Sequence, residues 1–330
     1  NEPDIAPGTS GFEFEGTLED YFMMVKVASI AAKQGNPEAE IHLAGTTYWH
    51  DVNNGARLYT DRLLERIAAD PDGAAHNYYF DALSLHIYFR TDTIYEIVRE
   101  YRALLDKHGF TDKAIWITET NTSPNLDPDW PVTRPQFQIS LDQQAAFVVQ
   151  SAALGLAAGA ERIAVYKLYD QFLPEGGESF GLLFPADSMP RPGFYAWQNV
   201  IERFADVITA DLTRHQNASI VRMHQTADRV TLAVWSRVGI TQTLTVSATS
   251  DKAYVFDQLG NAQIIRPQNG VYTLTLPGAI CEIDGEGCVV GGAVSIFVQP
   301  AGDVQLAILL DGESVPLAFG EGSQDSVLTR

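Results

Sequence analysis

The chain has 330 residues, of which 45% are hydrophobic and 10% aromatic, and its 42 acidic and 22 basic residues give a net charge of −20. This length and apolar content predict about two globular domains with a packed core and exclude a disordered chain. The negative charge argues against nucleic acid or an anionic membrane as a partner, because both bind basic surfaces.

The first predicted element is a helix. Thr17-Leu-Glu-Asp20 has the pattern of a capping box, and apolar residues at helical spacing follow it to about Gln34. A short strand at 41–45 comes next, followed by a helix from about 57 to 69 and a turn at 70–73. These segments begin an alternation of helices and strands.

A strand over 81–88 shows period-two alternation. Its two faces carry Leu83, Leu85 and Ile87 on one side, and Ser84, His86 and Tyr88 on the other. The alternation then continues with a helix at 94–109, a strand at 114–119, a helix at 140–159, a strand at 163–168 and a helix at about 195–204. Helices that alternate with strands predict a parallel sheet built from βα units.

The pattern changes after about residue 206. Short strand-like runs such as 230–235 and 243–247 are separated by turn residues, and Leu259-Gly-Asn261 and Asn269-Gly270 are hairpin signals. We therefore predict an all-β domain, a sandwich, to about residue 300. One more strand is expected at 304–310, before a polar end.

Two features bear on where the protein works. Cys281 and Cys288 flank a turn-prone acidic loop, and a disulfide between them would indicate an oxidising compartment, outside the cell or in the cell envelope. Two reduced thiols are the alternative. No apolar run approaches the roughly 18 residues of a transmembrane helix, so no membrane insertion is expected.

Two stretches have the residues of a catalytic site. Glu2 lies in Asn1-Glu2-Pro3, and Glu119 ends a predicted strand, where its spacing places it on the same face as Ile115 and Ile117. In a parallel α/β barrel the carboxyl ends of all strands open on one face, so the two glutamates can meet. Such a pair suits glycoside hydrolysis, in which one carboxyl group donates a proton and the other attacks the anomeric carbon.

These residues resemble those of clan A of the glycoside hydrolases, (β/α)8-barrel enzymes that cleave β-glycosides with retention. The resemblance implies that Glu2 is the general acid/base after the fourth strand and that Glu119 is the nucleophile ending the seventh. It also implies that Asn1 contacts the sugar 2-hydroxyl and that Tyr88 contacts the nucleophile. His86 is implied to line the substrate cleft. The implied function is retaining hydrolysis of β-glycosidic bonds in an oligosaccharide, polysaccharide or glycoconjugate.

The resemblance also implies an architecture. The strands predicted at 41, 83, 114 and 163 become the fifth to eighth of the barrel, and strands one to four have no counterpart. We therefore expect an α/β fold in which residues 1–205 are the C-terminal half of a (β/α)8 TIM barrel, 206–300 a β-sandwich and 301–330 an extension or tail. On this interpretation the chain is a fragment of a longer enzyme, and without strands one to four it lacks part of its catalytic domain.

Aromatic side chains near the strand ends are candidates for stacking on a carbohydrate substrate. These are Trp49, Trp130 and Tyr166, with Tyr169 as an alternative to Tyr166. Members of clan A often carry a tryptophan at the end of the eighth strand, and this sequence has tyrosines there instead. For Trp49 and Trp130, a role in covering the barrel rim remains the alternative.

No metal or cofactor is expected. His42, His50 and Asp51 lack the dense spacing of metal ligands, and no glycine-rich nucleotide motif follows a strand. The acidic residues of the later loops are expected to be solvated; they are Asp127, Asp129 and Asp170. The alternative function is a non-catalytic carbohydrate-binding or cell-surface interaction protein, which has no need of two opposed carboxylates.

Overall fold

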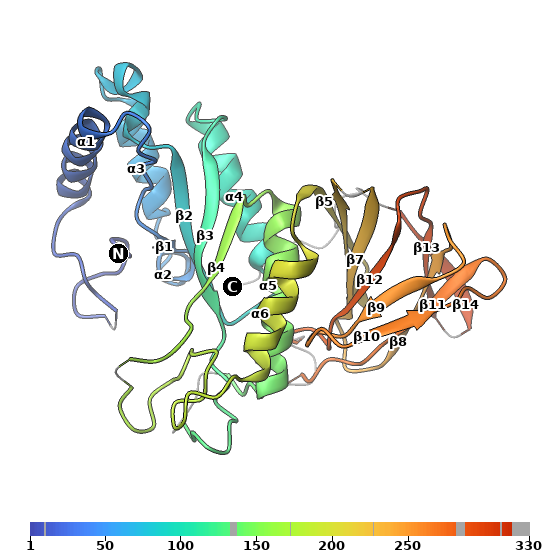
Figure 1. The fold of residues 1–330 in the computed structure, drawn as a ribbon. Helices are drawn as coiled ribbons and strands as arrows, with labels where there is room; N and C mark the ends of the chain where they lie inside the picture. The colour runs from blue at the N-terminus through green and yellow to red at the C-terminus, as the bar shows by residue number, and fades with distance from the viewer. Residues whose placement is uncertain are drawn as a thin grey trace.

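The computed structural model describes residues 1–9, 11–132, 137–171, 173–226, 228–281, 288–310 and 312–318. Figure 1 shows an α/β part, which contains one parallel sheet with its helices, beside a β part built of antiparallel strands. The polar end expected after the last strand falls mainly on residues 319–330, which lie outside the described residues.

The α/β part follows the predicted alternation of helices and strands. Its elements are α1 (Leu18–Gly35), β1 (Thr46–Thr47), α2 (Trp49–Asn53), α3 (Tyr59–Ala68), the 3-10 helix η1 (Gly73–Tyr79), β2 (Ala82–Tyr88), α4 (Ile94–Lys107), β3 (Ala114–Asn121), α5 (Leu141–Ala158), β4 (Arg162–Val165) and α6 (Pro192–Arg203). The strands pair in the order β1-β2-β3-β4, all parallel. The prediction of a parallel sheet of βα units is confirmed.

Local sequence signals account for the helix ends. Thr17 and Ser140 both form complete capping boxes, at the start of α1 and of α5. Helix α5 ends at Gly159, whose φ of 96° is a left-handed conformation that glycine adopts without strain. Helix α6 begins at Pro192, three residues earlier than expected, because proline is well suited to the first position of a helix.

Two strand predictions were misplaced. At 41–45 only His42 bridges to β2, and the assigned strand is Thr46–Thr47. The last parallel strand stops at Val165 instead of reaching 168. The chain leaves the sheet there because Lys167 pairs with the later segment, its carbonyl accepting a hydrogen bond from the Leu182 amide at 2.9 Å.

The β part contains two antiparallel sheets. Its strands are β5 (Val207–Arg214), β6 (Ala218–Gln225), β7 (Arg229–Ser236), β8 (Gln242–Ser247), β9 (Ala253–Phe256), β10 (Ala262–Ile265), β11 (Val271–Leu276), β12 (Ser295–Pro300), β13 (Leu306–Leu310) and β14 (Glu313–Leu317). One sheet has the order β10-β9-β12-β7-β6-β5 and the other β11-β8-β13-β14. Buried side chains of both sheets form one apolar core.

The β part adds two features to those expected. Asn269 and Gly270 form a turn with positive φ at both residues, but the strands around it, β10 and β11, lie in different sheets. Gln268 and Val271 form an antiparallel bridge across this turn, so the hairpin signal is confirmed locally, and the turn also carries the chain from one sheet to the other. Beyond the strand expected at 304–310, the structure adds β14, which pairs with β13.

The two parts pack closely through α5 and α6 (Figure 1). The Gln150 side chain, fully buried on α5, donates to the Gly292 carbonyl at 2.9 Å and accepts from the Gly291 amide at 3.0 Å. On α6, the Arg203 guanidinium lies 4.1 Å from the ring centre of Phe256. Because the β part covers one side of α5 and the parallel sheet the other, this alanine-rich helix is buried on nearly every side.

Cys281 and Cys288 are joined by a disulfide bond. This confirms the pairing expected from their spacing and is compatible with an extracellular protein. The acidic loop between them, 282–287, lies outside the described residues. In the part of the chain that the structure describes, no helix is long and apolar enough to cross a membrane.

Candidate active site

Glu119 lies near the carboxyl end of β3, on the face opposite to the one expected. The pairing of β2 with β3 shifts by one residue, so that Leu85 lies beside Ile117 but His86 lies beside Glu119. A bulge of this kind moves the following side chains to the other face of the sheet. Glu119 therefore joins His86 and Tyr88, and its predicted alignment with Ile117 is wrong.

Tyr88 holds the Glu119 carboxylate directly. Its hydroxyl donates to Glu119 Oε2 at 2.5 Å. Burial, and then the neighbouring Glu119, raise the pKa of the Tyr88 phenol well above its usual value. The phenol consequently keeps its proton and acts as a hydrogen-bond donor across the whole physiological pH range.

Glu2 reaches the same site from the start of the chain. Its backbone amide donates to the Gly45 carbonyl at 3.1 Å, and its φ of 37° lies in a region that residues with side chains seldom adopt. The buried carboxylate of Asp4 accepts from the Thr47 amide at 2.8 Å and from the Thr47 hydroxyl at 2.7 Å. These contacts fix the first residues against the end of β1.

His86 lies between the two glutamates. Its Nδ1 is 2.7 Å from Glu2 Oε1 and 3.5 Å from Glu119 Oε2, and its side chain is only 3% exposed. One oxygen of each carboxylate and one ring nitrogen all lie within 4.8 Å of one another. The two carboxylates, 117 positions apart in the sequence, therefore share one small site.

The same three side chains are the one group among the described residues that could hold a metal ion. A histidine nitrogen with two carboxylate oxygens is a donor set found around zinc and other transition metals. The hydrogen bond between His86 and Glu2 already accounts for the orientation of the ring. Direct hydrogen bonding is thus a sufficient description of how these residues fit together.

Gly45 makes room for the His86 ring. A Cβ atom added at Gly45 would lie 2.0 Å from Nε2 of His86, which no real pair of atoms tolerates. We expect Gly45→Ala to push the imidazole away from Glu2 and to lower the free energy of unfolding by about 1–3 kcal/mol, the usual cost of overpacking. Urea unfolding measures this loss.

Gly35→Ala is the matched control for this prediction. At Gly35 an added Cβ atom meets no heavy atom within 4 Å, so its free energy of unfolding should change by only about 1 kcal/mol or less. Equal unfolding curves for the Gly45 variant and the wild type would show that His86 tolerates displacement and is not fixed by Gly45.

The other predicted site residues make fewer contacts with Glu2, His86 and Glu119. Asn1 is exposed, and Tyr166 is 37% exposed, with its ring centre 6.2 Å from that of Tyr88. Trp49 belongs to α2 and packs against Tyr48, while the Trp130 indole donates to the Gly177 carbonyl at 2.8 Å. Neither tryptophan makes a hydrogen bond or ring contact with Glu2 or Glu119 within the described residues.

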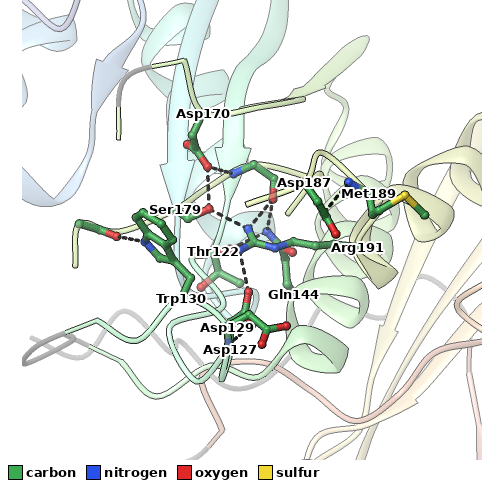
Figure 2. Close-up of polar contacts among 12 residues, drawn as sticks. Thr122, Asp127, Asp129, Trp130, Gln144, Asp170, Ser179, Asp187, Met189 and Arg191 are labelled. Carbon is green, nitrogen blue, oxygen red and sulfur yellow. Dashed lines mark hydrogen bonds and ion pairs between the residues drawn. The ribbon is translucent and has the colours of Figure 1, made fainter. Parts of the chain in front are cut away.

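The structure also contains a buried polar group that the sequence did not indicate. The Arg191 cluster, as we call it, consists of Arg191, Asp127, Asp170 and Ser179 (Figure 2). Arg191 is fully buried, and its guanidinium donates to Asp127 at 2.9 Å and to the Ser179 hydroxyl at 2.8 Å. The expectation that Asp127 and Asp170 are solvated is wrong, because each carboxylate side chain is only 1% exposed.

The Arg191 cluster joins the segment after β3 to the segment after β4. A weak signal for it exists in the sequence, where Arg191 stands between Pro190 and Pro192 at the start of a helix. Nothing local, however, pairs it with Asp127, 64 positions earlier.

Sequence comparison alone gives no relative, whereas comparison of folds does. No protein-family model matches the chain, and no curated protein sequence matches it. A family 39 glycoside hydrolase from Bacteroides cellulosilyticus WH2 has a similar fold, with a TM-score of 0.62 at 16% identity, over 85% of this chain and 54% of that one.

Two further structures show the same likeness. A glucosidase from Croceicoccus marinus gives a TM-score of 0.55 at 13% identity, over 92% of this chain and 68% of that one. A GH39 β-xylosidase from Caulobacter crescentus also gives 0.55, at 16% identity, over 91% of this chain and 65% of that one. The chain therefore has the fold of clan A glycoside hydrolases, as predicted, and spans between about half and two thirds of the length of these structures.

Proposed function

We propose that this protein is a retaining β-glycosidase in which Glu2 is the general acid/base and Glu119 is the nucleophile. The observation that carries the proposal is the shared site of the two carboxylates, with oxygens within 4.8 Å of each other. Retaining enzymes hold their carboxyl groups about 5–5.5 Å apart, and inverting enzymes about 6.5–9.5 Å. The close spacing here favours direct attack by one carboxylate over activation of a water molecule between the two.

In the first step Glu119 attacks the anomeric carbon while the bond to the leaving oxygen breaks. Protonated Glu2 gives its proton to that oxygen, and a covalent glycosyl-enzyme forms. The Tyr88 hydroxyl, bonded to Glu119 Oε2, fixes the carboxylate and leaves its other oxygen for attack. His86 contacts both glutamates and so fixes the position of one carboxylate relative to the other.

In the second step Glu2, now a carboxylate, takes a proton from water. The resulting hydroxide attacks the anomeric carbon from the opposite side and releases Glu119. The product keeps the β configuration, because two inversions have occurred. Proton NMR of the first product formed from a β-glycoside would show this configuration before mutarotation.

We further propose that the parallel sheet is the second half of a (β/α)8 barrel, formed by residues 1–205. Strand β4 supports this interpretation, because Arg162 and Ala164 on one of its faces are exposed. Further strands would cover that face and complete the ring. Residues 206–300 would then form a β-sandwich domain, to which the segment 301–330 contributes β13 and β14.

The substrate is proposed to be a carbohydrate held partly by aromatic rings. Tyr166, whose ring is close to that of Tyr88 and partly exposed, would stack on a sugar, and Trp49 and Trp130 would be further stacking residues. Asn1 would contact the 2-hydroxyl beside the nucleophile. The disulfide fits an enzyme that works outside the cell or in the cell envelope.

Glu2→Gln separates the acid role from the base role. We expect kcat/KM in the native protein to fall about 10²–10⁴-fold for a substrate with a poor leaving group, which needs the proton. With a 2,4-dinitrophenyl glycoside, the first step should proceed almost unchanged and the second should be slow. Stopped-flow measurement should therefore show a burst of dinitrophenol followed by slow turnover.

Glu13→Gln is the control, because Glu13 is exposed on the same segment of the chain. It should behave as the wild type with both substrates. Equal losses for the good and the poor leaving group in Glu2→Gln would contradict the acid/base role, because the leaving group would then not depend on a proton from Glu2.

A further inference from the structure

Phe180 is held in place on both sides by the Arg191 cluster (Figure 2 shows its neighbours). On one side, the Ser179 hydroxyl donates to Asp170 Oδ2 at 2.6 Å and accepts from Arg191. On the other, the Gly181 amide donates to the same oxygen at 3.0 Å, and the Gly181 carbonyl accepts from Arg191 at 2.9 Å. Ser179 by its hydroxyl and Gly181 by its backbone, the residues before and after Phe180, are thus bonded to the same two charged side chains.

The residues around Phe180 reinforce this position. A Cβ atom at Gly181 would lie 2.8 Å from Asp170 Oδ2, so only glycine lets the carboxylate approach this closely. The carbonyl of Phe180 itself accepts from Asn121 Nδ2 at 2.7 Å, and Asn121 is fully buried. Asn121 is paired with Tyr88 in the register of β2 and β3. Phe180 is therefore tied to the strand that carries Glu119.

The ring of Phe180 lies against Tyr88. The ring centres are 5.5 Å apart and the planes are inclined at 73°, an edge-to-face arrangement that is favourable for aromatic pairs. Phe180 also contacts Phe89, with ring centres 5.7 Å apart, and Tyr166, with centres 6.3 Å apart. A phenol ring packed in this way cannot turn freely about its side-chain bonds.

We propose that Phe180 is a positioning residue that holds the Tyr88 ring where its hydroxyl donates to Glu119. The inference rests on the proposed function for its catalytic consequence, since Glu119 is there the nucleophile. Arg191 and Asp170 hold Phe180, Phe180 packs against Tyr88, and Tyr88 bonds Glu119. The segment after β4 thereby fixes the geometry of a carboxylate on β3.

The position of Tyr88 can be measured without relying on catalysis. 3-Fluorotyrosine placed at position 88 gives a fluorine resonance that reports the surroundings of that ring. In Phe180→Leu we expect the resonance to shift towards that of the free amino acid and to broaden. In parallel, kcat should fall about 10-fold to 100-fold with little change in KM, as expected for a displaced catalytic group.

Two variants accompany Phe180→Leu. Phe180→Tyr keeps the aromatic ring and should restore both the fluorine resonance and kcat. Phe194→Leu makes the same substitution at a partly buried phenylalanine on α6, whose ring contacts Tyr195 and not Tyr88, and it should leave both readouts unchanged. Together they separate loss of the ring from a general loss of packing.

The outcomes distinguish this inference from the proposed function. An unchanged resonance in folded Phe180→Leu overturns the positioning role, even if KM rises, because Phe180 would then contact the sugar instead. A wild-type protein without turnover overturns the proposed function, and a shifted resonance would in that case still support the positioning role. A shifted resonance together with a lowered kcat supports both.

Discussion

Replacing Glu119 by glutamine is expected to reduce turnover by at least about a thousandfold, a rise of about 4 kcal/mol in the activation barrier. Glutamine has the shape of glutamate and still accepts the hydrogen bond from Tyr88, but its neutral amide is a poor nucleophile. Sugar affinity should persist, because binding does not need the charge. Steady-state kinetics and calorimetry of sugar binding measure the two effects separately.

A smaller side chain at position 119 gives a second test of the nucleophile. Glu119→Ala should recover activity when azide is added, since azide can enter the space and attack the anomeric carbon directly. The product should be a glycosyl azide of inverted configuration, because only one displacement has taken place. This outcome identifies the missing carboxylate by its chemistry as well as by the lost rate.

Glu161→Gln is the matched control, an exposed glutamate just before β4. It should keep wild-type kinetics. Retained turnover in Glu119→Gln would contradict the nucleophile role. A wild-type protein that binds sugar tightly without turnover, and that Glu119→Gln leaves unaffected, would instead indicate the non-catalytic carbohydrate-binding protein.

Replacing Arg191 by methionine is expected to lower the free energy of unfolding by about 3–5 kcal/mol. The substitution leaves the Asp127 carboxylate, only 1% exposed, without its cation in a site that water does not reach. Asp170 keeps Lys167 as a partner at 3.1 Å, so most of the cost comes from Asp127. Urea denaturation followed by tryptophan fluorescence measures the loss.

Arg266→Met provides the comparison, because Arg266 is 71% exposed and pairs with an exposed Asp251 at 3.7 Å. Exposed pairs contribute about 0–1 kcal/mol, so this variant should unfold almost as the wild type does. The double variant Arg191→Met/Asp127→Asn should be more stable than Arg191→Met alone, because it removes the unpaired charge. A loss of less than about 1 kcal/mol in Arg191→Met would show that water reaches the Arg191 cluster.

Local sequence patterns predicted helices and strands well where a single strong signal, such as a capping box or a period-two alternation, was present. The capping boxes at Thr17 and Ser140 mark the starts of α1 and α5, and the alternation at 81–88 marks β2. These signals depend on neighbours within a few residues, so they can be recognised in the sequence alone. Strand β1 and the end of β4 were misplaced, because pairing with distant segments decides where a strand begins and where it stops.

The face on which Glu119 lies shows where local reasoning fails. Period-two alternation predicted that Glu119 lies on the same face as Ile115 and Ile117. In the structure, the one-residue shift in the pairing of β2 with β3 places it on the face of His86 and Tyr88. A bulge depends on how two strands pair, and nothing in either strand alone records it. The proposal that Glu119 and Glu2 work together came from the resemblance to clan A, which implies that both follow strands of one barrel, whose carboxyl ends open on the same face.

The sequence by itself determined the α/β and β parts and the parallel sheet of βα units, because composition and periodicity are properties of short segments. The pair of glutamates was expected from the resemblance to clan A. Only the tertiary structure decided that Asp127 and Asp170 are buried with Arg191, that Gly45 makes room for His86 and that Phe180 packs on Tyr88. Each of these contacts joins residues tens of positions apart. Such contacts form only when the chain has folded, and their partners are chosen by shape and charge in three dimensions.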